Sequence, residues 1–79
     1  MTFNEALAER INELLSEKGI TQYRLSINSG VAAQSIDHIR QQRNQTNAVN
    51  IIFQIAQGLG MTLKEFFDSP LFDLENITD

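Results

Sequence analysis

The chain has 79 residues, and its six Lys and Arg against ten Asp and Glu give a net charge of −4. This length allows one small domain, and the hydrophobic share of 42% argues against a disordered chain. Because there is no cysteine, disulfides and thiolate metal sites are excluded. We expect a soluble, cytoplasmic protein, since no apolar run reaches membrane-span length and the N-terminus lacks the order of a signal peptide. At face value, the acidic total argues against a nucleic-acid partner.

The charges are unevenly distributed along the chain. Residues 1–17 sum to −3 and residues 65–79 to −5, whereas residues 18–64 sum to +4. An acidic chain with a basic middle favours a polar partner for one of its surfaces. The alternative is that the five basic residues of the middle segment are ordinary solvated side chains.

The first predicted helix begins at a capping box. Thr2 and Glu5 have the T-x-x-E spacing in which each residue satisfies a backbone N–H near the helix start. Gly19 ends this helix, because glycine readily takes the left-handed conformation that follows a helix C-terminus. Between them, apolar residues recur at helical spacing: Phe3, Leu7, Ile11, Leu14 and Leu15.

Two short helices follow. Thr21 can cap a second helix that ends near Ser29 and Gly30. A third helix is predicted from about Ala32 to Arg40 or Gln41, with isoleucines at 36 and 39 turned inward. Residues 41–47 are polar and aperiodic, which indicates a loop.

The last two predicted helices are separated by a glycine. The fourth closes at Gly60 and carries apolar side chains at helical spacing. Thr62 and Glu65 form a second capping box, and Pro70 stops the fifth helix that it opens. Residues 71–79 form an acidic tail that retains several apolar side chains. Because no strand pattern and no internal repeat is present, the fold class predicted is all-α, with five helices.

The second and third helices have the spacing of a helix-turn-helix. A tight turn at Ser29, Gly30 and Val31 would set the two helices across each other. Small Ser29, on the same face as Leu25, is expected to let the third helix approach closely. The outer face of the third helix would then be short and polar, which suits a major groove flanked by phosphates. Its side chains are Ala33, Gln34, Asp37, His38 and Gln41.

This pattern resembles that of a known family. The segment TQYRLSINSGVAAQSIDHIRQQRN, residues 21–44, is similar to the helix-turn-helix of Cro and phage-repressor proteins, the XRE or lambda-repressor-like family. The segment IIFQIAQGLGMTLKEFF, residues 51–67, is similar to the family's fourth and fifth helices. The resemblance implies a compact five-helix DNA-binding domain over residues 1–68, with the motif at about 21–41 and the recognition helix at about 32–41. It also implies a transcriptional regulator of the kind often found in phages, plasmids or mobile elements.

The resemblance assigns DNA-contacting roles by position. Gln22 matches a glutamine that contacts phosphate and braces the recognition helix, and Ser35 matches a position near the DNA backbone. Gln34 would pair with adenine, His38 would donate to guanine or phosphate, and Ala33 would touch a thymine methyl. Along the phosphates or beside them we place four further residues: Arg40, Gln41, Arg43 and Asn44.

The sequence also departs from the family pattern. Ala32 replaces the usual Ser or Thr cap, which removes a cap worth about 1 kcal/mol. Arg40 replaces an acidic residue and Leu15 an arginine, so a familiar buried ion pair is expected to be absent and Arg40 to be free to reach a phosphate. Gln42 replaces the glycine that usually follows the recognition helix, so the sequence does not establish the family's turn geometry at this position.

No catalytic, metal or cofactor site is predicted. Asp37 and His38 are adjacent on one helix and cannot face each other, and acidic residues spaced by four on the first helix are typical of solvated surface. The partners predicted are double-stranded DNA and a second copy of the chain, because one short helix reads only a few base pairs.

The alternative function is a protein-interaction module, such as an antitoxin or antirepressor component. Tyr23 and Ile27 would form an apolar pair on the outer face of the second helix. Either the tail covers this pair, or a partner protein does, or the two side chains are simply exposed. The possible contacts with tail or partner are Tyr23, Ile27, Phe67 and Phe72, with Leu74 and Ile77 as further apolar side chains of the tail.

Overall fold

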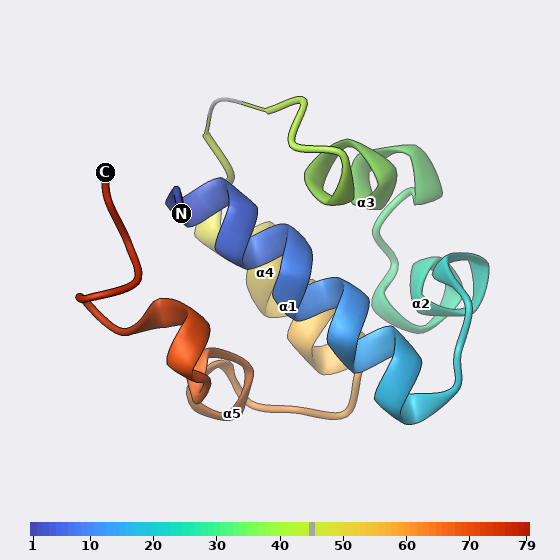
Figure 1. Ribbon diagram of the computed structural model, residues 1–79. Helices are drawn as coiled ribbons and strands as arrows, with labels where there is room; N and C mark the ends of the chain where they lie inside the picture. Colours follow the sequence, from blue (N-terminus) through green and yellow to red (C-terminus); the bar gives the residue numbers. More distant parts are fainter. Residues whose placement is uncertain (45) are drawn as a thin grey trace.

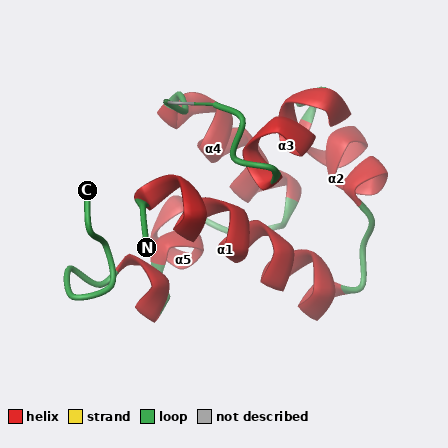
Figure 2. Cartoon of the chain, turned by 45° about the horizontal axis from the view of Figure 1, so that its top comes forward, coloured by secondary structure: helices red, strands yellow, loops and turns green. Residues whose placement is uncertain are grey.

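The computed structural model describes residues 1–44 and 46–79, so Gln45 of the predicted loop lies outside the described residues. The described part contains five α-helices, a final 3-10 turn and no strand (Figures 1 and 2). This confirms the all-α prediction. In chain order the elements are α1 (Phe3–Lys18), α2 (Gln22–Ser29), α3 (Ala33–Arg40), α4 (Val49–Gly58), α5 (Leu63–Phe67) and η1 (Pro70–Phe72).

The predicted caps set the helix boundaries. In the first capping box, the Glu5 amide donates to Thr2 Oγ1 at 3.1 Å and the Thr2 amide donates to Glu5 Oε1 at 2.8 Å. Thr62 and Glu65 repeat both bonds at the start of α5. Gly19 ends α1 in the left-handed conformation, with φ of 63°. Helix α4 ends at Gly58, slightly before the predicted glycine.

One hydrophobic core holds the helices together. Every helix contributes a side chain to it, because each has apolar residues along one face. The helix-turn-helix supplies Leu25, Val31, Ile36 and Ile39, and α5 supplies Phe66, which is completely buried. The remaining members are Leu7, Ile11, Leu14, Leu15, Ile52, Ile55, Ala56 and Leu59.

Helices α2 and α4 approach each other closely at one point. A Cβ atom placed on Gly58 would lie 2.6 Å from Ser29 Cβ and 2.9 Å from the Ser29 backbone. The small size of Ser29 therefore serves its contact with α4. The expectation that it also lets α3 approach closely stays a prediction.

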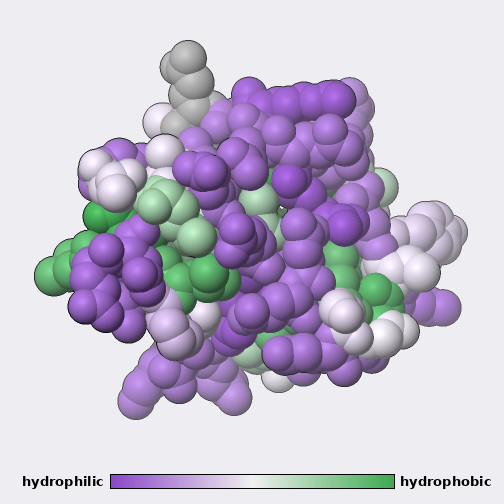
Figure 3. All heavy atoms as spheres, in the orientation of Figure 1, coloured by the Kyte–Doolittle hydropathy of each residue, from purple (hydrophilic) through white to green (hydrophobic). Residues whose placement is uncertain are grey.

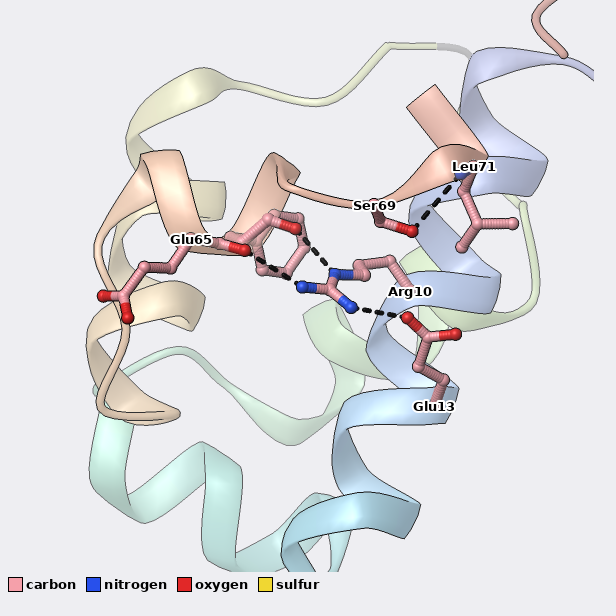
Figure 4. Close-up of polar contacts among 6 residues, drawn as sticks. Arg10, Glu13, Glu65, Ser69 and Leu71 are labelled. Atoms are coloured by element: carbon pink, nitrogen blue, oxygen red, sulfur yellow. Dashed lines mark hydrogen bonds and ion pairs between the residues drawn. The ribbon is translucent and has the colours of Figure 1, made fainter. Parts of the chain in front are cut away.

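Buried Arg10 links α1 to the C-terminal end of α5 (Figure 4). It is 8% exposed, its Nε donates to the Phe66 carbonyl at 2.6 Å, and its Nη2 donates to the Glu65 carbonyl at 2.9 Å. Its Nη1 forms an ion pair with Glu13. The guanidinium thus gives charged donors to two carbonyls at the end of α5, one of which, that of Glu65, also accepts from the Asp68 amide at 3.2 Å.

The tail folds back on the N-terminal end of the chain. Phe72 of η1 packs edge to face on Phe67, with ring centroids 4.8 Å apart, and also contacts Phe3 at 5.9 Å. Farther along, the Thr78 amide donates to the Met1 carbonyl at 2.9 Å. The two chain ends accordingly lie near each other (Figure 1). Among the helices of the described part, none is long and apolar enough to cross a bilayer.

Candidate nucleic-acid interface

The turn between α2 and α3 has the predicted construction. Gly30 takes the left-handed conformation with φ of 75°, and its amide donates to the Ser26 carbonyl. The Val31 amide donates to Ser29 Oγ at 3.1 Å, and the Val31 side chain is buried. Glycine suits this position because a Cβ disfavours positive φ. The turn therefore anchors α3 across α2, as in a helix-turn-helix.

The N-terminus of α3 has no side-chain cap. Ala32 occupies the cap position and makes no side-chain hydrogen bond there, as its replacement of Ser or Thr predicted. Only its carbonyl takes part, accepting from the amides of Ser35 at 2.9 Å and Ile36 at 3.2 Å. The first amides of this turn are therefore left without a side-chain acceptor from the cap residue.

The outer face of α3 is polar. Gln34, Ser35 and Gln41 are exposed, while Ala33 and His38 are half-buried. The surface over α3 in Figure 3 is hydrophilic, whereas hydrophobic residues show on the side of the chain ends and again at the right, toward α2. The amide of Gln34 makes no hydrogen bond within the described residues, so it is available to an incoming base edge.

Gln22 braces the recognition helix as predicted. Its Nε2 donates to the Ala33 carbonyl in the first turn of α3 at 3.2 Å. Its own position at the start of α2 is fixed by Thr21, whose hydroxyl accepts from the Arg24 amide. The phosphate contact implied for Gln22 stays a prediction.

Arg40 is engaged within the protein. Its Nε donates to Asn12 Oδ1 at 2.6 Å, and its Nη1 donates to Gln22 Oε1 at 2.8 Å. Leu15, which replaces the family's arginine, is buried and apolar and cannot form the family's ion pair. The hydrogen bonds of Arg40 with Asn12 and Gln22 take the place of that ion pair. The expectation that Arg40 is free was wrong, because Asn12 and Gln22 supply acceptors from two other helices.

The loop after α3 is tied to α1 by three asparagines. Asn4 Nδ2 donates to the Asn44 carbonyl at 3.0 Å, and Asn47 Nδ2 donates to Asn4 Oδ1 at 2.9 Å. Asn44 Nδ2 completes the group by donating to Asn47 Oδ1 at 3.2 Å. These contacts hold Asn44 and Asn47 of the loop near the start of α1, while Arg43 stays exposed.

Gln42 keeps the turn that the family builds with glycine. Its φ is 58°, in the left-handed region, and no other non-glycine residue of the described chain has positive φ. The Arg43 amide then donates to the His38 carbonyl at 2.9 Å and closes the helix end. The substitution thus leaves the geometry of the turn intact and adds local backbone strain.

Polar side chains surround an open hollow between α1 and α3. Its volume is about 380 Å³, and its lining residues are Asn12, Asp37, Arg40 and Gln41. Gln41 Nε2 donates to Asp37 Oδ1 at 3.3 Å, so the carboxylate beside the proposed groove-facing surface is partly satisfied. Within the described residues, no three acidic or histidine side chains lie close enough to bind a metal ion.

The tail does not cover the apolar pair on α2. Tyr23 and Ile27 are 70% and 53% exposed. The expectation that the tail covers them was wrong, because Phe72 packs with Phe67 on the far side of the molecule, and Leu74 is 95% exposed. Phe72 of the tail instead contacts Phe67, with ring centroids 4.8 Å apart.

Sequence reasoning missed Arg10, Asn12, Asn4 and Asn47. Arg10 entered only the charge count, although its spacing from Glu13 was compatible with an ion pair on one helix face. The partners of the other three lie 28 to 43 residues away in the chain. No local pattern identifies such partners.

Comparison with known proteins supports the assignment of a helix-turn-helix to α2 and α3. The profile of the Cro/C1-type HTH DNA-binding domain matches residues 10–70, well over half of the chain. No curated protein matches the chain in sequence.

Two solved structures have the same fold. The restriction-modification controller protein C.Esp1396I is 23% identical, covers 86% of this chain and 88% of its own, and superposes with a TM-score of 0.76. The prophage Lp1 protein 11 is also 23% identical, with coverage of 87% and 91% and a TM-score of 0.76. With a helix-turn-helix, a polar α3 and this profile match in hand, the chain belongs to the Cro/C1-type HTH DNA-binding family and is a DNA-binding transcriptional regulator.

Proposed function

We propose that the chain is a sequence-specific, repressor-like regulator that inserts α3 into the major groove of DNA. One observation carries this proposal: α3 is held by Gln22 at its first turn and through Arg40 at its last, while its outer face stays polar and accessible. The major groove of B-DNA admits an α-helix, and a helix fixed at both ends presents its side chains in one register.

The outer side chains divide into reading and positioning groups. Gln34 would pair with adenine, His38 would donate to guanine, and Ala33 would pack on a thymine methyl. Phosphate contacts would fix the register of α3 without reading sequence. We assign these to Gln22, Ser35, Gln41, Arg43 and Asn44.

A homodimer would supply the second half-site. Half-sites read by such helices lie about 34 Å apart, one turn of DNA. Residues 1–68 would form the reading unit and residues 69–79 its cover over the start of α1, and the protein would act in the cytoplasm without any catalytic step.

The test is binding to duplexes selected from a random pool and to fragments upstream of the chain's own gene, at several salt concentrations. Arg43→Ala should weaken all duplexes alike and lower the salt slope by about one. Gln34→Ala should cost about tenfold on the selected duplex only. Gln57→Ala, an exposed change on α4, is the matched control and should alter neither quantity.

A protein-interaction module is the second candidate function, and the exposed Tyr23 and Ile27 favour it. In that case the chain would select no duplex even in dilute salt. It would instead bind the product of a neighbouring gene, and Ile27→Ser with Tyr23→Ser would abolish that complex. This outcome would contradict the DNA-reading proposal.

A further inference from the structure

Arg40 joins three helices through two acceptors. It lies in the last turn of α3, half-buried, with Nε on Asn12 of α1 and Nη1 on Gln22 of α2. Gln22 in turn donates to the Ala33 carbonyl in the first turn of α3. The amide of Gln22 therefore links the first turn of α3 to a side chain that comes from its last turn.

This arrangement selects one orientation of the Gln22 amide. A glutamine amide has one oxygen acceptor and two N–H donors, and rotation by half a turn exchanges them. In the observed orientation, the oxygen faces the guanidinium at 2.8 Å and Nε2 faces a carbonyl at 3.2 Å. The rotated amide would set donor against donor at Arg40 and acceptor against acceptor at Ala33.

One N–H of Gln22 has no partner among the described residues. Nε2 carries two hydrogens, and the Ala33 carbonyl takes one of them. With the amide held by a charge-assisted bond on its oxygen side, the second hydrogen keeps a fixed direction at the start of α2. A fixed donor of this kind binds an anionic oxygen without first losing rotational freedom.

We propose that Arg40 is a positioning residue for DNA binding: it fixes the amide of Gln22 so that the second N–H donates to a DNA phosphate. We assign the phosphate contact to Gln22 and not to Arg40, whose Nε and Nη1 already donate to Asn12 and Gln22. This inference rests on the proposed insertion of α3 into DNA.

The variant Arg40→Lys separates the two roles, since it keeps the positive charge and loses the planar pair of donors. On the selected duplex we expect Gln22→Ala and Arg40→Lys each to weaken binding about tenfold, as the loss of one oriented hydrogen bond does. The double variant should bind no more weakly than Gln22→Ala alone, because Arg40 acts through Gln22. Losses that multiply to about a hundredfold would mean that Arg40 contacts DNA directly and would overturn the proposal.

A second measurement needs no DNA. In a nitrogen-15 NMR spectrum of the full chain, the side-chain amide of Gln22 should lose its distinct shift in Arg40→Lys and approach the exposed amide of Gln57. Unchanged Gln22 signals would overturn the inference. Failure of the unmodified chain to select any duplex would overturn the proposed function instead, so the two failures are distinguishable.

Discussion

At the scale of single residues, Arg10 is the clearest case of a charge used inside the fold. Its side chain is 10% exposed and bonds two carbonyls at the end of α5, whereas its ion-pair partner Glu13 is 41% exposed. We expect Arg10→Met to lower the free energy of unfolding by about 2 kcal/mol, because the carbonyls lose charged donors. Glu13→Gln should cost less than about 0.5 kcal/mol, since an exposed ion pair contributes little. Urea denaturation of both variants measures the difference, and equal losses would contradict this role of Arg10.

Gln42 should be a site where substitution stabilises the chain. Its φ of 58° is unfavourable for a residue with a Cβ and is ordinary for glycine. After the greater entropy of an unfolded glycine is allowed for, we expect Gln42→Gly to gain about 0.5 to 1 kcal/mol. The change is measured as a higher midpoint of urea unfolding, and Gln41→Gly is the control, which should destabilise the end of α3.

At the scale of elements, the packing of α2 on α4 depends on Gly58. A glycine-to-alanine change inside a helix normally adds up to about 1 kcal/mol of stability. Here the new methyl group would meet Ser29 Cβ at 2.6 Å and backbone at 2.9 Å, so the helices must separate. We expect Gly58→Ala to destabilise the chain by about 2 kcal/mol and to lower DNA affinity, while the neighbouring Gln57→Ala does neither. Thermal melting with both variants decides between packing and helix propensity.

The elements themselves were predictable from sequence, because caps are local. The capping boxes at Thr2 and Thr62, and the glycine stops at 19 and 30, each involve residues within a few positions of one another. The place of the tail was not predictable, because Phe72 meets Phe3 and Phe67 through the tertiary fold and not through any periodicity.

Helical spacing also predicted which side chains lie on the outer face of α3, and Gln34 and Ser35 are exposed as expected. The engagement of Arg40 was not readable, since its acceptors Asn12 and Gln22 lie 28 and 18 residues away. The expectation that Arg40 reaches a phosphate considered only its charge. Its guanidinium also has N–H donors with fixed directions, and Asn12 and Gln22 accept two of them.

At the scale of the whole molecule, two carboxylates link stability to pH. Hydrogen bonds from the Thr2 backbone and hydroxyl lower the pKa of Glu5 below its ordinary value of 4.5, and Thr62 does the same for the pKa of Glu65. The folded chain therefore binds protons less readily than the unfolded chain at these sites. The stability that they contribute is present at neutral pH and is lost as pH falls through their lowered folded-state pKa values.

We expect the double variant Glu5→Gln and Glu65→Gln to lose less stability than the unmodified chain between about pH 7 and pH 3. Glutamine can take the same place in a capping box, so the two chains should be similar in stability at pH 7. Glu17→Gln, an exposed change outside both boxes, is the control and should leave the acid sensitivity unchanged. Urea midpoints across this pH range test the prediction, and parallel curves for all three chains would contradict it.

The burial of Arg10 and the engagement of Arg40 bear on how the regulator searches a genome. Six basic residues are present, but only four of them are exposed: Lys18, Arg24, Arg43 and Lys64. Attraction to arbitrary DNA comes from such free cations, so each encounter away from the operator should be brief. A cell would then locate the operator quickly by maintaining many copies of the regulator, each making short visits, and not by long sliding runs of a few.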